Sequence, residues 1–305
     1  MTRGPGPSSF ETFPGAGGQS LSYMRRGSGA LLVCVPGGPG LDPEAYFAGV
    51  ELTGVEMLIF APRGTALSTP PESSDGYRIA GYVEDLECLR VHLGLDRLTL
   101  YGNSYGGSVA LAYASRHPDR VDGLIISNAA VRVDQAFEDA AARACERLVA
   151  HIPDAADRLA AAEVADAAAE ADSSDAANQR AFRASMACGF AHLGPAEAGY
   201  LDRLTAAPRN ADAVAGMWVE WRAGLDLLEG LDSVTAPTLL IGAQFDIVVP
   251  SEVVAQIAEA MPNARYLEMP DVGHFVAVEA PDQFQNVVRE FLERSSTTSP
   301  KVPGA

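Results

Sequence analysis

A serine flanked by glycines lies in the segment Gly102-Asn-Ser-Tyr-Gly106. The apolar run Leu98–Tyr101 precedes this segment, and an Ala-rich run of helical character follows it as far as Tyr113. The pattern predicts a strand, a strained turn and a helix, with Ser104 exposed at the turn. Glycines two residues before and after the serine remove side chains that would clash with neighbouring backbone. We therefore expect Ser104 to act as a nucleophile. The alternative is a Gly-rich turn whose serine only caps the helix.

A serine hydroxyl is a good nucleophile only when a base takes its proton and an acid orients that base. On a strand–turn–helix scaffold the chain order is serine, acid, histidine. His274 is the last histidine and follows a strand-like run, so it is the expected base. Asp246, just past the run Thr238–Ile241, is the expected acid. Asp271 is the competitor, but it stands only three residues before His274 and is poorly placed to reach back to the imidazole.

Acyl transfer also needs N–H donors directed at the developing oxyanion. The backbone N–H of Tyr105, immediately after the nucleophile, is one expected donor. The second should come from the loop Pro36-Gly-Gly-Pro-Gly40, which follows the first buried strand. Pro39 has no N–H, so Gly38 is the best candidate and Gly37 is the reserve.

Apolar runs alternate with helical patterns along the chain, which predicts a mostly parallel sheet covered by helices on both faces. From about residue 131 to 233 the strand pattern stops and the sequence becomes Ala-rich, charged and helical. We expect this stretch to form a cap over the carboxyl ends of the strands, where such sheets bind ligands. The predicted division is a first core part (1–130), a helical cap (131–233), a second core part (234–294) and a flexible tail (295–305).

Composition limits the partners. The formal net charge of −18 argues against nucleic acid and anionic membrane surfaces. No apolar run approaches the about 18 residues of a membrane span. Met1–Phe13 is typical of a frayed arm rather than a signal peptide, so a cytoplasmic location is expected. The four cysteines are far apart and lack metal-ligand spacing, so we expect reduced thiols, no metal and no cofactor.

These motifs together resemble the α/β-hydrolase superfamily and, within it, the proline iminopeptidase branch. The Gly37–Gly40 loop resembles that branch's H-G-G-P-G loop, Arg63-Gly64 with Ser68 resembles its D-x-R-G-x-G-x-S stretch, and Gly102–Gly107 matches its G-x-S-[YW]-G-G elbow. Gly242–Asp246 and Gly273-His274 match the acid and base segments. The resemblance covers roughly residues 20–130 and 235–294, and it implies an eight-stranded, mostly parallel sheet with an inserted helical cap.

The sequence departs from the family pattern at three positions, where Pro36, Ala61 and Leu67 replace the family's His, Asp and Gly. Family aminopeptidases bind the free amine of the substrate with cap glutamates near a W-x-x-W-E segment. The corresponding segment here is Trp218-Val-Glu-Trp-Arg222, in which an arginine follows the second tryptophan. The candidate substrate-binding residues are therefore Gly37, Trp218, Glu220 and Trp221.

The leading hypothesis is a serine hydrolase that needs no cofactor and cleaves an amide or ester of a small molecule or short peptide, in the manner of a proline iminopeptidase. A carboxylesterase, lactonase or thioesterase is an alternative, as is an enzyme that uses the same residues for C–C bond cleavage or acyl transfer. A ligand receptor on an inactive hydrolase fold is a hypothesis of another class. Such receptors commonly lose a catalytic residue, whereas all three are present here. For the oligomeric state, the sequence is compatible with a monomer or a homodimer.

Overall fold

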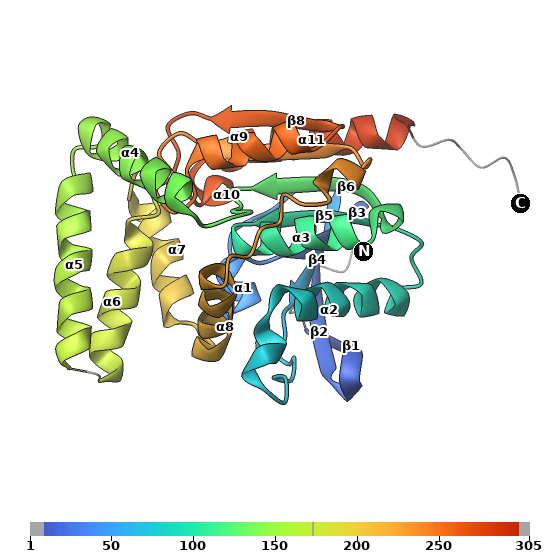
Figure 1. Cartoon of the computed structure of the whole chain (residues 1–305), viewed down its shortest axis with the longest axis horizontal. Coiled ribbons are helices and arrows are strands. Elements are labelled where there is room, and N and C mark those ends of the chain that lie inside the picture. Colours follow the sequence, from blue (N-terminus) through green and yellow to red (C-terminus); the bar gives the residue numbers. More distant parts are fainter. Residues whose placement is uncertain (1–8, 173, 299–305) are drawn as a thin grey trace, which may run out of the picture.

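One sheet organises the computed structural model, which describes residues 9–172 and 174–298 (Figure 1). Its eight strands lie in the order β1-β2-β4-β3-β5-β6-β7-β8. Their bounds are Glu11–Pro14 (β1), Ser20–Gly27 (β2), Ala30–Val35 (β3), Val55–Ala61 (β4), Leu98–Asn103 (β5), Val121–Ser127 (β6), Thr238–Ala243 (β7) and Ala264–Met269 (β8). The β1–β2 and β2–β4 pairs are antiparallel, and all other neighbours pair in parallel. The predicted eight-stranded, mostly parallel sheet is confirmed.

Helices cover both faces of the sheet because its central strands are apolar on both sides. In β3, Val33 and Val35 contribute to the core on one face of the sheet, whereas Leu32 and Cys34 contribute to the core on the other face. The helices are Pro43–Tyr46 (α1), Ile79–His92 (α2), Tyr105–Arg116 (α3), Gln135–His151 (α4), Ala155–Ala171 (α5), Asp175–Ala187 (α6), Pro195–Ala206 (α7), Ala211–Arg222 (α8), Ser251–Ala260 (α9), Val276–Glu279 (α10) and Pro281–Thr298 (α11).

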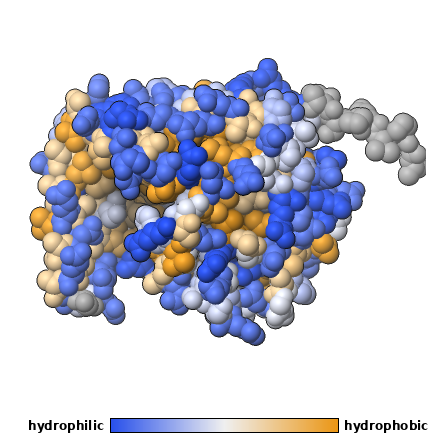
Figure 2. Space-filling model, in the orientation of Figure 1, coloured by the Kyte–Doolittle hydropathy of each residue, from blue (hydrophilic) through white to orange (hydrophobic). Residues whose placement is uncertain are grey.

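Five helices, α4 to α8, occupy the chain between β6 and β7, and we call them the inserted helices. They stand at the left of Figure 1, on the side toward which the arrowheads of β6 and β8 point. Figure 2 shows the surface of the molecule from the same direction as Figure 1. Hydrophilic residues are spread over this surface, and hydrophobic residues gather near the middle of the view, between the inserted helices and the rest of the protein.

Both expected terminal segments are shorter than the sequence suggested. Glu11–Pro14 forms β1 and pairs with β2, so the last residues of the expected N-terminal arm belong to the sheet. At the other end, α11 continues through Thr298 into the expected flexible tail. Phe284 and Val288 anchor this helix in the core, and the polar residues after Glu293 extend it as far as Thr298. Residues 1–8 and 299–305 of these two segments lie outside the described residues.

The loop after β4 is held by a buried ion pair. Arg63 donates from Nε and Nη2 to the two carboxylate oxygens of Asp85 in α2, each at 2.7 Å. Its guanidinium also donates to the carbonyl oxygens of Gly76 and Gly81, again at 2.7 Å. Ser68 closes the same loop by donating to the carbonyl of Ala61 at 2.7 Å. These contacts fix the segment that leads from the sheet to α2.

The four cysteines are free thiols, as expected. Cys34 and Cys188 are buried, and Cys88 and Cys145 are partly buried. Burial raises the pKa of each thiol, which disfavours the reactive thiolate. Among the helices that the structure describes, none is long and apolar enough to cross a membrane.

Candidate active site

Ser104 occupies a strained turn between β5 and α3. Its backbone has φ 54° and ψ −127°, a conformation that L residues rarely adopt. The turn is held because the N–H of Ser104 donates to the carbonyl of Ser127 at 2.9 Å. Such a turn projects the serine side chain away from the backbone that passes beneath it, which is the geometry expected of an exposed nucleophile.

The flanking glycines permit this turn because the backbone approaches closely on both sides. A Cβ on Gly102 would lie 2.4 Å from the carbonyl oxygen of Gly106. A Cβ on Gly106 would lie 2.3 Å from the carbonyl oxygen of Val35, in the strand next to β5. The predicted reason for the two glycines is therefore confirmed.

Gly106→Ala is expected to lower the free energy of unfolding by about 1–3 kcal/mol, because the backbone of β3 must move away from the new methyl group. Denaturant unfolding measures the change. The matched control is Gly199→Ala in α7, where a Cβ would meet nothing closer than Arg203 Nη1 at 3.7 Å. That control should keep or raise the stability, since alanine is the better helix former. Equal stability of the Gly106→Ala variant and the wild type would contradict the close approach.

Asp246 and His274 are joined by a buried hydrogen bond. His274 Nδ1 donates to Asp246 Oδ2 at 2.8 Å, and the aspartate is fully buried while the histidine is 5% exposed. The other carboxylate oxygen, Oδ1, accepts from the backbone N–H groups of Val248 at 2.8 Å and Val249 at 2.9 Å. The bond to Nδ1 leaves Nε2 of the imidazole without a proton, so this nitrogen can accept one.

Asn128 also holds the aspartate, and the sequence analysis did not single it out. Its Nδ2 donates to Asp246 Oδ2 at 2.6 Å. The residue adopts φ 51°, a left-handed conformation that asparagine tolerates better than most residues, and its N–H donates to the carbonyl of Ile241 at 2.9 Å. The available signal was an asparagine immediately after the apolar strand Val121–Ser127.

Asp271, the competing acid, has a different partner. Its Oδ1 lies 2.8 Å from Nε2 of His192, and both side chains are exposed. The structure therefore brings Asp246, and not Asp271, to His274. The sequence argument against Asp271 rested on its short separation from the histidine, and the carboxylate that it favoured is the one that bonds His274.

Four neighbouring parallel strands bring these groups to one edge of the sheet. Ser104 follows β5, Asn128 follows β6, Asp246 lies three residues past β7, and His274 lies in the loop after β8. Because the carboxyl ends of parallel strands meet at the same edge, the serine, the aspartate and the histidine share one end of the sheet.

The loop after β3 packs directly against the serine. A Cβ on Gly37 would lie 2.9 Å from Ser104 Cβ and 2.2 Å from the Tyr46 hydroxyl, so only glycine fits there. Burial raises the pKa of Tyr46, and a hydrogen bond from the N–H of Gly37 opposes that rise. Gly38 follows in the same loop with φ 58°, and its role as the oxyanion donor stays a prediction. Tyr105 begins α3, where an N–H has no acceptor within the helix.

Asn103 fixes the residue before the nucleophile. Its Oδ1 accepts from the Tyr46 hydroxyl, and its Nδ2 donates to the carbonyl and hydroxyl oxygens of Ser127 at 3.1 and 2.9 Å. The Tyr46 carbonyl in turn accepts from the Tyr200 hydroxyl at 2.8 Å, which links the α1 segment to an inserted helix, α7. Hydrogen bonds to α1 and to the end of β6 therefore stabilise the turn that holds Ser104.

A small, largely apolar cavity lies beside Gly38 and Tyr105 and is also lined by Pro36, Leu41 and Tyr82. Two tyrosines, Tyr82 and Tyr105, are among its lining residues. The hydroxyl groups of Tyr82 and Tyr105 are buried and have no hydrogen-bond partner among the described residues, and their rings meet edge to face with centroids 5.8 Å apart. Burial raises the pKa of both phenols, so both remain protonated donors. Buried hydroxyls without a protein partner are costly unless water or a bound molecule satisfies them.

The candidate substrate residues of α8 are divided by the structure. Trp221 is buried in the core, whereas Trp218 is 45% exposed beneath the Arg222 guanidinium. Glu220 is partly buried, and its Oε2 accepts from the N–H of Ile79 at 2.7 Å. Burial raises the pKa of Glu220, and the N–H of Ile79 opposes this effect.

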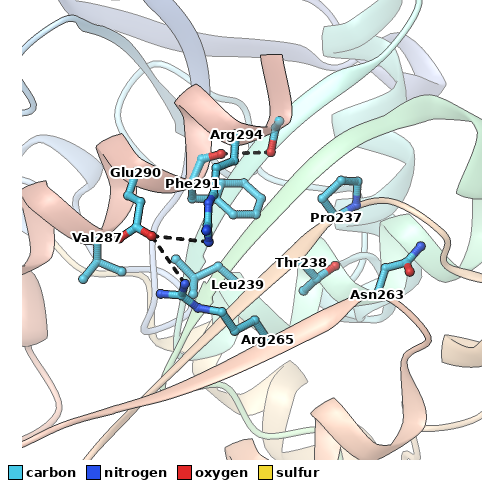
Figure 3. Close-up of a pocket in the computed structure, with 10 residues that line it drawn as sticks. Pro237, Thr238, Leu239, Asn263, Arg265, Val287, Glu290, Phe291 and Arg294 are labelled. Atoms are coloured by element: carbon cyan, nitrogen blue, oxygen red, sulfur yellow. Dashed lines mark hydrogen bonds and ion pairs between the residues drawn. The ribbon is translucent and has the colours of Figure 1, made fainter. Parts of the chain in front are cut away.

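Another groove lies at the opposite end of the sheet, beside α11 and the start of β7 (Figure 3). Glu290 lies between Arg265 and Arg294 there, with N–O distances of 3.6 and 3.3 Å. None of the predicted site residues lines this groove. Within residues 9–172 and 174–298 there is also no cluster of three or more metal-ligating side chains.

Known proteins share both sequence and fold with this chain. A family model described as the alpha/beta hydrolase fold matches residues 30–281. A proline iminopeptidase from Saccharolobus solfataricus is 26% identical over 286 residues, which cover 89% of this chain and 87% of the relative.

Two solved structures extend this similarity. A thermophilic esterase from Thermogutta terrifontis aligns with a TM-score of 0.65 at 24% identity, covering 95% of this chain and 99% of the esterase. A proline iminopeptidase from Mycobacterium smegmatis aligns with a TM-score of 0.69 at 21% identity, covering 95% and 99% of the two chains. Both likenesses show a shared fold, and with the family match they confirm the predicted fold class.

Proposed function

Because this chain belongs to the alpha/beta hydrolase fold family, we propose that it is a serine hydrolase in which Ser104, His274 and Asp246 form the catalytic triad. The observation that carries the proposal is the buried bond between His274 Nδ1 and Asp246 Oδ2 at the sheet edge where Ser104 sits on its strained turn. We further propose that the inserted helices, together with the rest of residues 131–233, act as the cap that selects the substrate.

The proposed reaction proceeds through an acyl-enzyme. Ser104 Oγ attacks the substrate carbonyl while Nε2 of His274 takes the hydroxyl proton. The buried charge of Asp246 stabilises the imidazolium, and the N–H groups of Gly38 and Tyr105 stabilise the oxyanion. The imidazolium then protonates the leaving amine or alcohol, and water, activated by the same histidine, releases the acyl group and restores the serine.

The cavity beside the oxyanion donors supports a small substrate with an amino group near the scissile bond. Its two unpaired phenols can donate to or accept from a polar group in an otherwise apolar pocket. The Glu220 carboxylate accepts from the N–H of Ile79, one helical turn before Tyr82 in α2. Burial raises the pKa of both phenols, and the negative charge of Glu220 raises it further. An ammonium group bound among them would suit an aminopeptidase acting on short peptides, because the Glu220 carboxylate, which accepts from the N–H of Ile79, could pair with it as well.

Labelling with a fluorophosphonate probe tests the triad. The wild type is expected to be labelled and the Ser104→Ala variant to remain unlabelled, because the probe reacts with an activated serine. Ser115→Ala, on the same helix α3, is the matched control and should label like the wild type. A folded wild type that resists the probe would overturn the proposal and favour the receptor hypothesis.

A panel of proline and alanine anilides and short acyl esters then separates the substrate classes. Turnover of prolyl anilide that is lost in Ser104→Ala would support the aminopeptidase. Turnover of esters alone would assign the protein to the esterases and contradict the role proposed for Glu220.

A further inference from the structure

Glu279 in α10 connects the loop of the catalytic histidine to the inserted helices. Its Oε1 accepts from the N–H groups of Gly273 and Phe275, at 3.1 and 3.2 Å, which flank His274 on both sides. Its Oε2 accepts from the N–H of Ala191 at 2.8 Å and from that of Gly273 at 3.1 Å. Ala191 lies between α6 and α7, so one carboxylate binds backbone from two distant parts of the chain.

Only a carboxylate can make this set of contacts. All three partners are N–H donors. Oε1 accepts two of these hydrogen bonds and Oε2 also accepts two, so both oxygens must be acceptors. An amide at this position has one acceptor oxygen, and its NH2 group would point at an N–H donor. Glutamine could therefore hold the histidine loop or Ala191, but not both.

The segment that Glu279 binds is itself fixed from both sides. Arg158 in α5 donates to the carbonyl oxygens of Phe190 and Ala191, at 2.7 and 2.9 Å. The carbonyl of Gly189 accepts from the N–H of His274 at 2.6 Å. A Cβ on Gly273 would lie 2.4 Å from that same carbonyl oxygen, which leaves the two segments no room to slide.

The charge of Glu279 is consistent with this arrangement. Burial raises the pKa of Glu279, the backbone N–H groups lower it, and the nearby charge of Asp246 raises it further. The net result is a pKa of about 7. Burying a carboxylate costs free energy unless hydrogen bonds compensate for the lost water. For Glu279 the backbone N–H donors provide this compensation. The proposed mechanism gives Glu279 no part in bond making or breaking.

We propose that Glu279 is a positioning residue, which holds His274 at its place relative to Ser104 by fastening the histidine loop to the Gly189–Ala191 segment of the proposed cap. The inference rests on the proposed triad. It predicts that the reactivity of Ser104 depends on a residue that touches neither the serine nor the substrate, because a small displacement of a catalytic base is costly.

The test measures the rate constant of fluorophosphonate labelling per folded site. In Glu279→Gln it is expected to fall about 10- to 100-fold while the final labelled fraction stays complete. All variants are assayed at one temperature, well below the lowest of their melting temperatures, and each rate constant is normalised to the folded fraction, so a lower stability alone would leave it unchanged. Glu279→Asp keeps both oxygens and should react faster than Glu279→Ala, which decides the question if the Gln variant does not fold.

The control is Glu290→Gln in α11, an exposed glutamate at the far end of the sheet, and it should label at the wild-type rate. Labelling of Glu279→Gln within two-fold of the wild type, or equal rates for the Asp and Ala variants, would overturn the inference and leave the triad standing. A wild type that does not label would overturn the triad itself.

Discussion

Asp246→Asn is expected to lower kcat by about four orders of magnitude. Both oxygens of Asp246 are committed, since Oδ1 accepts from Val248 and Val249 while Oδ2 accepts from Asn128 and His274. In the variant the amide oxygen should take the Oδ1 position, where two fixed backbone donors require an acceptor. The amide NH2 group then faces the imidazole and forces Nδ1 to accept. The proton moves to Nε2, which can no longer take one from Ser104.

Steady-state turnover of the best substrate in the anilide and ester panel measures this loss. Asp271→Asn is the matched control, because Asp271 pairs with the exposed His192 and its substitution should leave kcat unchanged. A circular dichroism spectrum identical to that of the wild type would show that Asp246→Asn remains folded. A large loss in Asp271→Asn with little in Asp246→Asn would reverse the assignment of the acid.

Asp85→Ala is expected to destabilise the protein by about 3–5 kcal/mol, since it leaves the Arg63 guanidinium charged and unpaired in a buried place. Arg63 would keep only its bonds to the carbonyls of Gly76 and Gly81. The affected loop also contacts the inserted helices, because Asn210, which caps the start of α8, donates to the carbonyl of Gly64 at 3.2 Å and to the Tyr77 hydroxyl at 2.7 Å. Activity should therefore fall with stability.

Chemical denaturation measures this effect. The control is Asp75→Asn, which removes an exposed Arg–Asp pair of the same 2.7 Å length from the same loop, and should change little. The double variant Arg63→Met, Asp85→Leu should be far more stable than Asp85→Ala, because replacing a whole buried pair by apolar residues costs much less than leaving one charge unpaired. A double variant as unstable as the single one would show that the carbonyl bonds of Arg63 dominate.

The sequence predicted the parts of the site that depend on local pattern. The Gly102–Gly106 spacing identifies the turn because a side chain at either glycine would collide with backbone, that of the turn itself for Gly102 and that of the neighbouring strand β3 for Gly106. The position of His274 after the last strand, and of Asp246 after β7, follows from the strand order along the chain. These residues could be found because a repeating strand–helix pattern fixes where the carboxyl ends of the strands must lie.

The residues that the sequence did not reveal act through contacts between distant segments. Asn128 reaches Asp246 across 118 positions, and Glu279 reaches Ala191 across 88. Neither belongs to a local motif that the pattern of apolar residues defines. The flexible tail was expected from residue 295, which is too early because α11 continues to Thr298. The polar residues after Glu293 are compatible with either a helix surface or a tail.

The pairing of β6 with β7 bears on how proteins of this design can diversify. Leu124 pairs with Thr238 and Ser127 with Ile241, so the two strands join in register as if the hundred or so residues between them were absent. The length and sequence of that excursion are therefore not constrained by the sheet, and evolution can exchange it without disturbing the strands that carry the serine, the acid and the base. The exceptions include Asn128, which donates to Asp246, and Gly189–Ala191, whose backbone meets the histidine loop. A graft that replaces the inserted helices should keep Gly189–Ala191, because without this segment we expect His274 to be displaced from Ser104.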